Sequence, residues 1–187
     1  MKTRLTGKII VSITVLLLGI AIVSYAADDE FEPQDRIESN YFTVYLASGV
    51  NESNLVQALN MGSADSMLVG RRSTAELALP EMLDTLFARV SEILDMHITS
   101  LKVNVKVCRD YGQLKNIYEN LFSAELGRRS FYVFSFNTIY IAPDSFTREI
   151  LGHEVAHAII SHYFVVQPPV KVQEVLAGYV EFQLKKQ

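Results

Sequence analysis

The chain has 187 residues, of which 49% are hydrophobic and 20% charged, and its formal net charge is -4. This length predicts one domain with its own core rather than two. Basic residues form no cluster beyond pairs such as Arg128-Arg129, so we expect no nucleic-acid binding. Cys108 is the single cysteine, which excludes a disulfide framework and a cysteine-based zinc site within the chain. Its position at the end of an alternating strand pattern predicts a packing role.

Residues 1–26 have the order of a secretory signal peptide. Three basic residues precede the apolar run of residues 9–23, and Ser24-Tyr25-Ala26 offers small residues at both key positions of a cleavage site. Residues 9–27 are also long enough to span a bilayer, so an uncleaved membrane anchor is the alternative. Both hypotheses place the rest of the chain outside the cytoplasm, periplasmic or secreted, because the positive end stays inside. The polar residues 27–40 are then predicted to form a linker.

Residues 41–187 show a mixture of strand and helix patterns without strict alternation. The short aromatic and β-branched segments predict strands, and the apolar repeats at three and four residues predict helices. The order predicts an α+β domain with a mixed, mostly antiparallel sheet packed on helices. Strands are expected at 41–46, 101–107, 130–136 and 138–142, and helices at 52–61, from Ser73 onward with a capping box, 111–122, 146–164 and 170–184.

The segment His153-Glu154-Val155-Ala156-His157 carries the His-Glu-x-x-His pattern. On a helix, residues four apart lie on one face, so both imidazoles can reach one metal ion. Glu154 projects about 100° away from His153, which suits a general base better than a third ligand. The alternative is a core helix with two surface histidines, but burying two unpaired imidazoles on an otherwise apolar helix is costly.

A catalytic zinc ion needs a third protein ligand and an open position. Glu174 is the preferred candidate, because it lies 17 residues after His157 on a helix that a Pro-Pro turn would fold back. Glu181 lies two turns further on and is expected to support a ligand or to be solvated. His162 leaves the ligand face of its helix, and His97 is expected at a turn or helix end.

These residues make the chain resemble the minimal gluzincin metallopeptidases. The match consists of the His-Glu-x-x-His motif and of Glu174-x-x-Ala177 followed by Tyr179, with Lys171 and Val175 replacing the usual Trp and Gly. The resemblance implies a small zincin-like domain in which His153, His157 and Glu174 hold Zn²⁺ and Glu154 is the general base acting on zinc-bound water. It implies a zinc peptidase.

The resemblance also implies that residues 138–142 form the edge strand of the cleft, where a peptide or protein substrate in extended conformation would pair with it. The oxyanion donor is expected from Tyr179 or Tyr163, although each is an ordinary packing aromatic by type. Two alternatives remain open at this point. One is a catalytically silent zinc-binding domain that binds peptides or protein partners, and the other is a structural protein with an accidental motif.

Overall fold

The computed structural model describes residues 29–59 and 78–186. The predicted leader and anchor therefore lie outside the described residues, as does the proposed capping box at Ser73. Within the part of the chain that is described, no helix is both long enough and apolar enough to cross a membrane.

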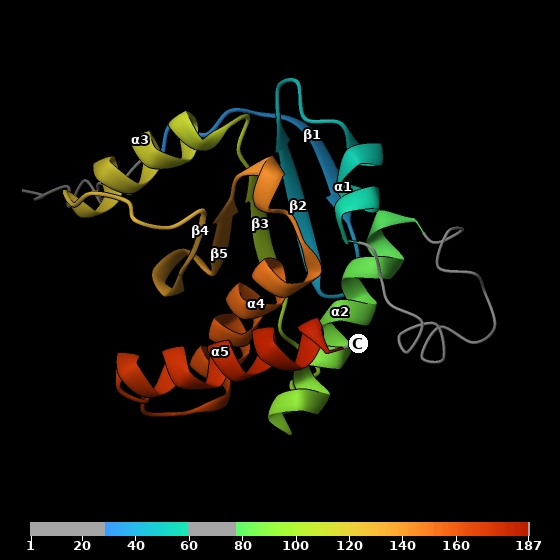
Figure 1. Cartoon of the computed structure of the whole chain (residues 1–187), viewed down its shortest axis with the longest axis vertical. Coiled ribbons are helices and arrows are strands. Elements are labelled where there is room, and N and C mark those ends of the chain that lie inside the picture. Colours follow the sequence, from blue (N-terminus) through green and yellow to red (C-terminus); the bar gives the residue numbers. More distant parts are fainter. Residues whose placement is uncertain (1–28, 60–77, 187) are drawn as a thin grey trace, which may run out of the picture.

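Five strands form one mixed sheet in the order β1-β2-β3-β5-β4 (Figure 1). The β1–β2 and β4–β5 pairs are antiparallel, whereas β2–β3 and β3–β5 are parallel. The α+β prediction is confirmed, but the sheet is evenly mixed rather than mostly antiparallel. The strands are β1 (Pro33–Glu38), β2 (Phe42–Ala47), β3 (Val103–Val107), β4 (Ser130–Val133) and β5 (Thr138–Ile141).

Helices cover both faces of this sheet. On one face the apolar sides of α1, α2, α4 and α5 share a core with alternate strand residues such as Val105 and Ile139. On the other face α3 packs over Phe131 and Tyr140. The helices are α1 (Glu52–Leu59), α2 (Leu79–Leu94), α3 (Tyr111–Phe122), α4 (Arg148–Tyr163) and α5 (Val170–Lys185), with short 3-10 turns at η3 (Phe134–Phe136) and η4 (Pro143–Ser145).

Two boundaries differ from the sequence prediction. The segment expected to be a linker contains β1, which pairs with β2 through Ile37 and Val44 among others. The sequence did not predict this strand because most of its side chains are polar. They can be polar since β1 lies at an edge of the sheet and is mostly exposed. The helix expected from Ser73 begins at Leu79, after Ala78 as N-cap and with Pro80 in its first turn, where proline is tolerated.

The strand predicted to be the edge of the cleft is an interior strand. β5 is hydrogen-bonded to β3 on one side and to β4 on the other, so residues 138–142 have no free edge for a substrate. Among the described residues β4 is the edge strand at this end of the sheet, opposite β1, and η3 rather than Asn137 alone connects it to β5. The sequence did not reveal this order because strand neighbours are set by pairing between distant segments.

A buried polar cluster holds the start of the described chain against the sheet. The Asp29 carboxylate forms an ion pair with Lys106 of β3 and accepts a hydrogen bond from the Tyr140 hydroxyl of β5. Burial alone would raise the pKa of Asp29, but these hydrogen bonds and the Lys106 charge outweigh it and lower the pKa.

Candidate metal centre

The two histidines of the motif lie on α4, most of whose residues are buried. Thr147 caps its N-terminus by accepting a hydrogen bond from the Ile150 N–H. α5 approaches so closely that a Cβ at Gly152 would lie 2.3 Å from Leu184 Cδ1. Ala177 of α5 is fully buried, as expected for a small residue that lets two helices pack closely. This helix pair brings Glu174 to the motif.

His153, His157 and Glu174 form one cluster of potential metal ligands, whose ligand atoms all lie within 4.8 Å of one another. The two Nε2 atoms are 3.2 Å apart. Glu174 Oε2 lies 3.6 Å from His153 Nε2, and Oε1 lies 3.8 Å from His157 Nε2. Tetrahedral zinc with bonds of about 2.0–2.1 Å separates its ligands by roughly 3.3 Å. The donor set and its spacing therefore fit a zinc ion.

The protonation of the histidines favours metal binding. Burial lowers the pKa of His153, although the nearby carboxylates act in the opposite direction. Burial also lowers the pKa of His157, and the proximity of His153 lowers it further. Both imidazoles are thus neutral near pH 7, which is the form that coordinates a metal ion.

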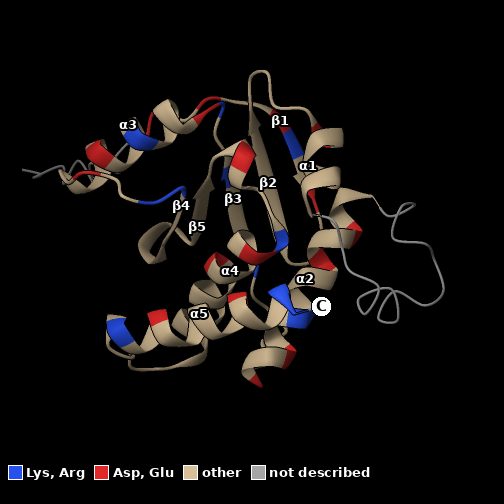
Figure 2. Cartoon of the chain, viewed as in Figure 1, with Lys and Arg blue, Asp and Glu red and all other residues tan. Residues whose placement is uncertain are grey.

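The carboxylate of Glu174 bonds to a cation that the sequence did not single out. Arg128 Nη1 lies 3.0 Å from Glu174 Oε1. Burial acts to raise the pKa of Glu174, but the hydrogen bond and charge of Arg128 outweigh it and the net pKa is lowered. Figure 2 shows the basic pair Arg128-Arg129 just before β4. In the sequence, nothing but its position just before a predicted strand set this pair apart from the other basic pairs.

Glu181 lies behind the first histidine, where it can orient the ring. Its Oε2 is 3.4 Å from His153 Nδ1, although the two atoms are not aligned for a hydrogen bond. Glu181 also pairs with Lys185. The charge of a carboxylate at this distance favours a proton on Nδ1, which leaves Nε2 free for the metal. Glu181 therefore lies close enough to His153 to support it, while it also bonds to the solvent-exposed Lys185.

Glu154 is 3% exposed and lies on the inner side of α4, facing the start of β4. The Ser130 hydroxyl donates a hydrogen bond of 2.7 Å to its Oε1. Burial raises the pKa of Glu154 to about 7, even though Ser130 and the charge of Arg128 act to lower it. A carboxyl group with a pKa near neutrality suits a general base. Ser130 carried no signal in the sequence beyond its position at the start of a strand.

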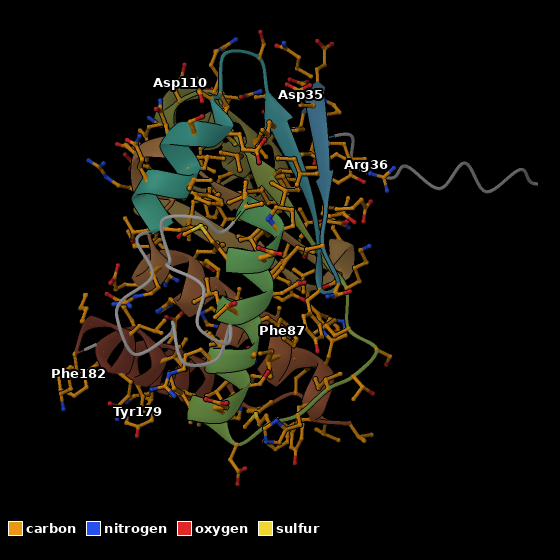
Figure 3. The ribbon with its side chains drawn as sticks, turned by 90° about the vertical axis from the view of Figure 1, so that its right-hand side faces the viewer. Asp35, Arg36, Phe87, Asp110, Tyr179 and Phe182 are labelled. Carbon is orange, nitrogen blue, oxygen red and sulfur yellow. The ribbon has the colours of Figure 1, made fainter. Side chains whose placement is uncertain are left out.

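The predicted oxyanion donor does not reach this cluster. Tyr179 is 48% exposed, and its hydroxyl accepts a hydrogen bond from Gln183 on the same helix. Figure 3 shows Tyr179 on the outer surface of α5. Tyr163 is equally exposed at the end of α4. Neither tyrosine lines the two cavities beside the ligands.

The other two histidines lie outside the ligand cluster, as predicted. His162 Nδ1 contacts the Ala158 carbonyl oxygen at 2.9 Å, within α4. His97 is in a loop, 3.7 Å from the Asp95 carboxylate. Among the described residues, only His153, His157 and Glu174 group as possible metal ligands.

Two cavities open beside the ligands and share Arg128, Glu154 and Glu174 as walls. The larger, about 590 Å³, extends from His157 toward α3 and the α4–α5 loop. The smaller, about 340 Å³, lies beside His153 and is bounded by Arg129 and other polar side chains. A substrate that spans the ligand cluster would therefore occupy a large compartment on one side and a small polar one on the other.

Comparison of the chain with models of protein families, with curated proteins and with solved structures finds no match.

Proposed function

We propose that the protein is a zinc-dependent peptidase that hydrolyses peptide bonds outside the cytoplasm. The observation that carries the proposal is the cluster of His153, His157 and Glu174 with the buried Glu154 beside it. The resemblance to minimal gluzincins and the leader pattern of residues 1–26 support the same function and location. When bound, zinc supplies a Lewis acid that polarises the scissile carbonyl and acidifies a nearby water.

Glu154 acts as the general base. With a pKa of about 7, its carboxylate takes a proton from the attacking water and its carboxylic acid then gives it to the leaving amine. The Ser130 hydroxyl donates a hydrogen bond to Oε1, and the Tyr132 backbone N–H also bonds to the carboxylate, so β4 orients the base at two points. Because Ser130 is the first residue of β4, the base is held in a fixed position beside the free edge of the sheet.

The substrate pairs with β4 in place of the interior strand that the sequence suggested. Among the described residues no strand lies beyond β4, so an extended peptide can add there as a sixth strand by β-augmentation, beside the Tyr132 N–H that bonds to Glu154. The larger cavity is lined by Phe131 and Tyr132 of β4 and by Glu154 and His157 of α4. A peptide along this edge therefore passes beside the ligands and the base.

In this proposal Arg128, in place of Tyr179, stabilises the oxyanion. Its guanidinium bonds to Glu174 through Nη1 and lines both cavities, and its charge also acts on Glu154 and both histidines. A fixed cation at this place stabilises negative charge that develops on the carbonyl oxygen. Arg109 is the matched control, because its guanidinium pairs with Asp110 and it lines neither cavity.

Zinc analysis and a peptide-library digest test the proposal together. The wild type and Glu154→Gln are both expected to bind one zinc ion, whereas only the wild type cleaves peptides. His153→Ala is expected to lose zinc and turnover, and His97→Ala to retain both. Unchanged turnover in Glu154→Gln would refute the mechanism. Stoichiometric zinc without any cleavage would instead support the silent zinc-binding domain.

The role of Arg128 is tested with Arg128→Gln and Arg109→Gln. Loss of one oxyanion donor typically costs about 100- to 1000-fold in kcat. We expect a loss of this size in Arg128→Gln, with zinc affinity and KM nearly unchanged, and little effect in Arg109→Gln. If Arg128→Gln mainly weakens zinc binding, then Arg128 orients Glu174 and does not stabilise the transition state.

A further inference from the structure

An aromatic wall lines the larger cavity beyond the ligands. Tyr118 and Phe122 of α3, Phe131 of β4 and Phe134 of η3 contribute to it, and we call these four residues the aromatic subsite. Tyr118 contacts Phe122 and Phe131 with ring centroids 4.8 and 5.0 Å apart. Three of the four rings thus form one patch from two elements that are separate in the sequence.

Two of these rings are exposed to an unusual degree for phenylalanine. Phe122 is 45% exposed and contacts the buried Phe131, and Phe134 is 52% exposed and contacts the His162 ring of α4. Apolar surface gains free energy when it is removed from water, and exposed apolar patches in clefts commonly mark binding sites. The patch continues directly into the walls of the proposed catalytic site through Arg128, Glu154 and His157.

The pleat of β4 determines how a substrate would use this patch. Ser130 directs its hydroxyl to Glu154 on the α4 side, whereas Phe131 and Val133 belong to the core under α3. A strand added to β4 would alternate in the same way, because successive side chains point to opposite faces. Every second side chain of the peptide would then face α3, where Tyr118 and Phe122 lie.

We propose that the aromatic subsite binds a bulky apolar side chain of an extended peptide, close to the scissile bond. The inference rests on the proposed peptidase function and adds its substrate class: unfolded or extended segments with a large apolar residue, rather than uniformly polar ones. None of the four residues of the subsite is charged, so it offers no partner for a charged side chain.

Peptide binding to the zinc-loaded Glu154→Gln protein tests this inference without cleavage. The probes are short fluorescein-labelled peptides of Ser and Gly, each with one Phe at a different position, and the parent without Phe. At least one Phe peptide is expected to bind about tenfold more tightly than the parent, the gain expected from burying one apolar side chain. Equal affinity for all peptides would overturn the inference.

Phe122→Ser is expected to abolish that preference, and Phe182→Ser is the matched control. Phe182 is the same residue type with a similar exposure of 53%, but it lies on the outer side of α5, away from the subsite (Figure 3). Phe134→Ser provides a second variant, and thermal melts of each verify folding. A Phe preference that survives both subsite variants would overturn the inference.

The same measurements separate this inference from the peptidase proposal. If Phe122-dependent binding persists after chelation and no peptide is cleaved with zinc, the subsite is upheld and the peptidase proposal fails. If peptides are cleaved in a Glu154-dependent manner without any preference for Phe, the peptidase proposal is upheld and the subsite fails.

Discussion

Replacing Glu154 by Gln is expected to stabilise the metal-free protein at alkaline pH. Burial raises the pKa of this carboxyl from 4.5 to about 7, so its ionisation in the folded state is costly. Each pKa unit corresponds to about 1.36 kcal/mol, which gives a cost of about 3 kcal/mol at full ionisation. Glutamine has nearly the same shape, can still accept the Ser130 hydrogen bond and carries no charge.

The direction of this pH effect follows from the pKa of Glu154, which is higher in the folded state than in the unfolded state. Below pH 4.5 Glu154 is protonated in both the folded and the unfolded state, and it does not destabilise the wild type. As the pH rises through about 7, Glu154 ionises in the folded state and the free energy of unfolding falls. The two proteins should therefore be similar at pH 4.5, and the variant should be more stable by about 3 kcal/mol above pH 8.

Urea unfolding in the presence of a chelator, at several pH values, measures this difference. Exposed Glu125→Gln is the control, with an expected change below about 0.5 kcal/mol at every pH. A difference between wild type and Glu154→Gln that does not depend on pH, or greater stability of the wild type at pH 8, would refute the assignment of a buried, destabilised base.

Three further predictions concern the surroundings of the site. Ser130→Ala removes a hydrogen bond that lowers the pKa of Glu154. In the same urea series, this variant should therefore lose stability at a higher pH than the wild type, and an unchanged pH midpoint of that loss would contradict the contact. Gly152→Ala should lower the free energy of unfolding by about 1–3 kcal/mol, because its Cβ would meet Leu184, and this loss should shrink in a Leu184→Ala background. Asp29→Asn should lower stability at pH 7, and the difference from wild type should fade as the pH drops below 3.8, since a lowered carboxylate pKa contributes stability only above that range; equal stabilities at pH 7 would argue against the cluster with Lys106.

The fully buried Cys108 agrees with the packing role predicted from its strand pattern. Burial raises the pKa of its thiol to about 12, so the reactive thiolate is scarce near neutrality.

The sequence by itself determined the local part of this candidate site. His153 and His157 share a face because four residues make about one helical turn, and the apolar residues around them required that helix to be buried. The Pro-Pro turn and the small Ala177 indicated that a second helix would bring Glu174 back. Each of these inferences depends on neighbours within a short stretch of chain.

Only the tertiary structure decided what surrounds the ligands. Sheet order made β4 an edge strand and β5 an interior strand, since strand pairing joins segments whose sequences do not specify their neighbours. The same packing placed Arg128 on Glu174 and Ser130 on Glu154, and it left Tyr179 on the surface. Glu154 owes its raised pKa to that enclosure, because desolvation depends on all the elements that meet around a group and not on its own helix.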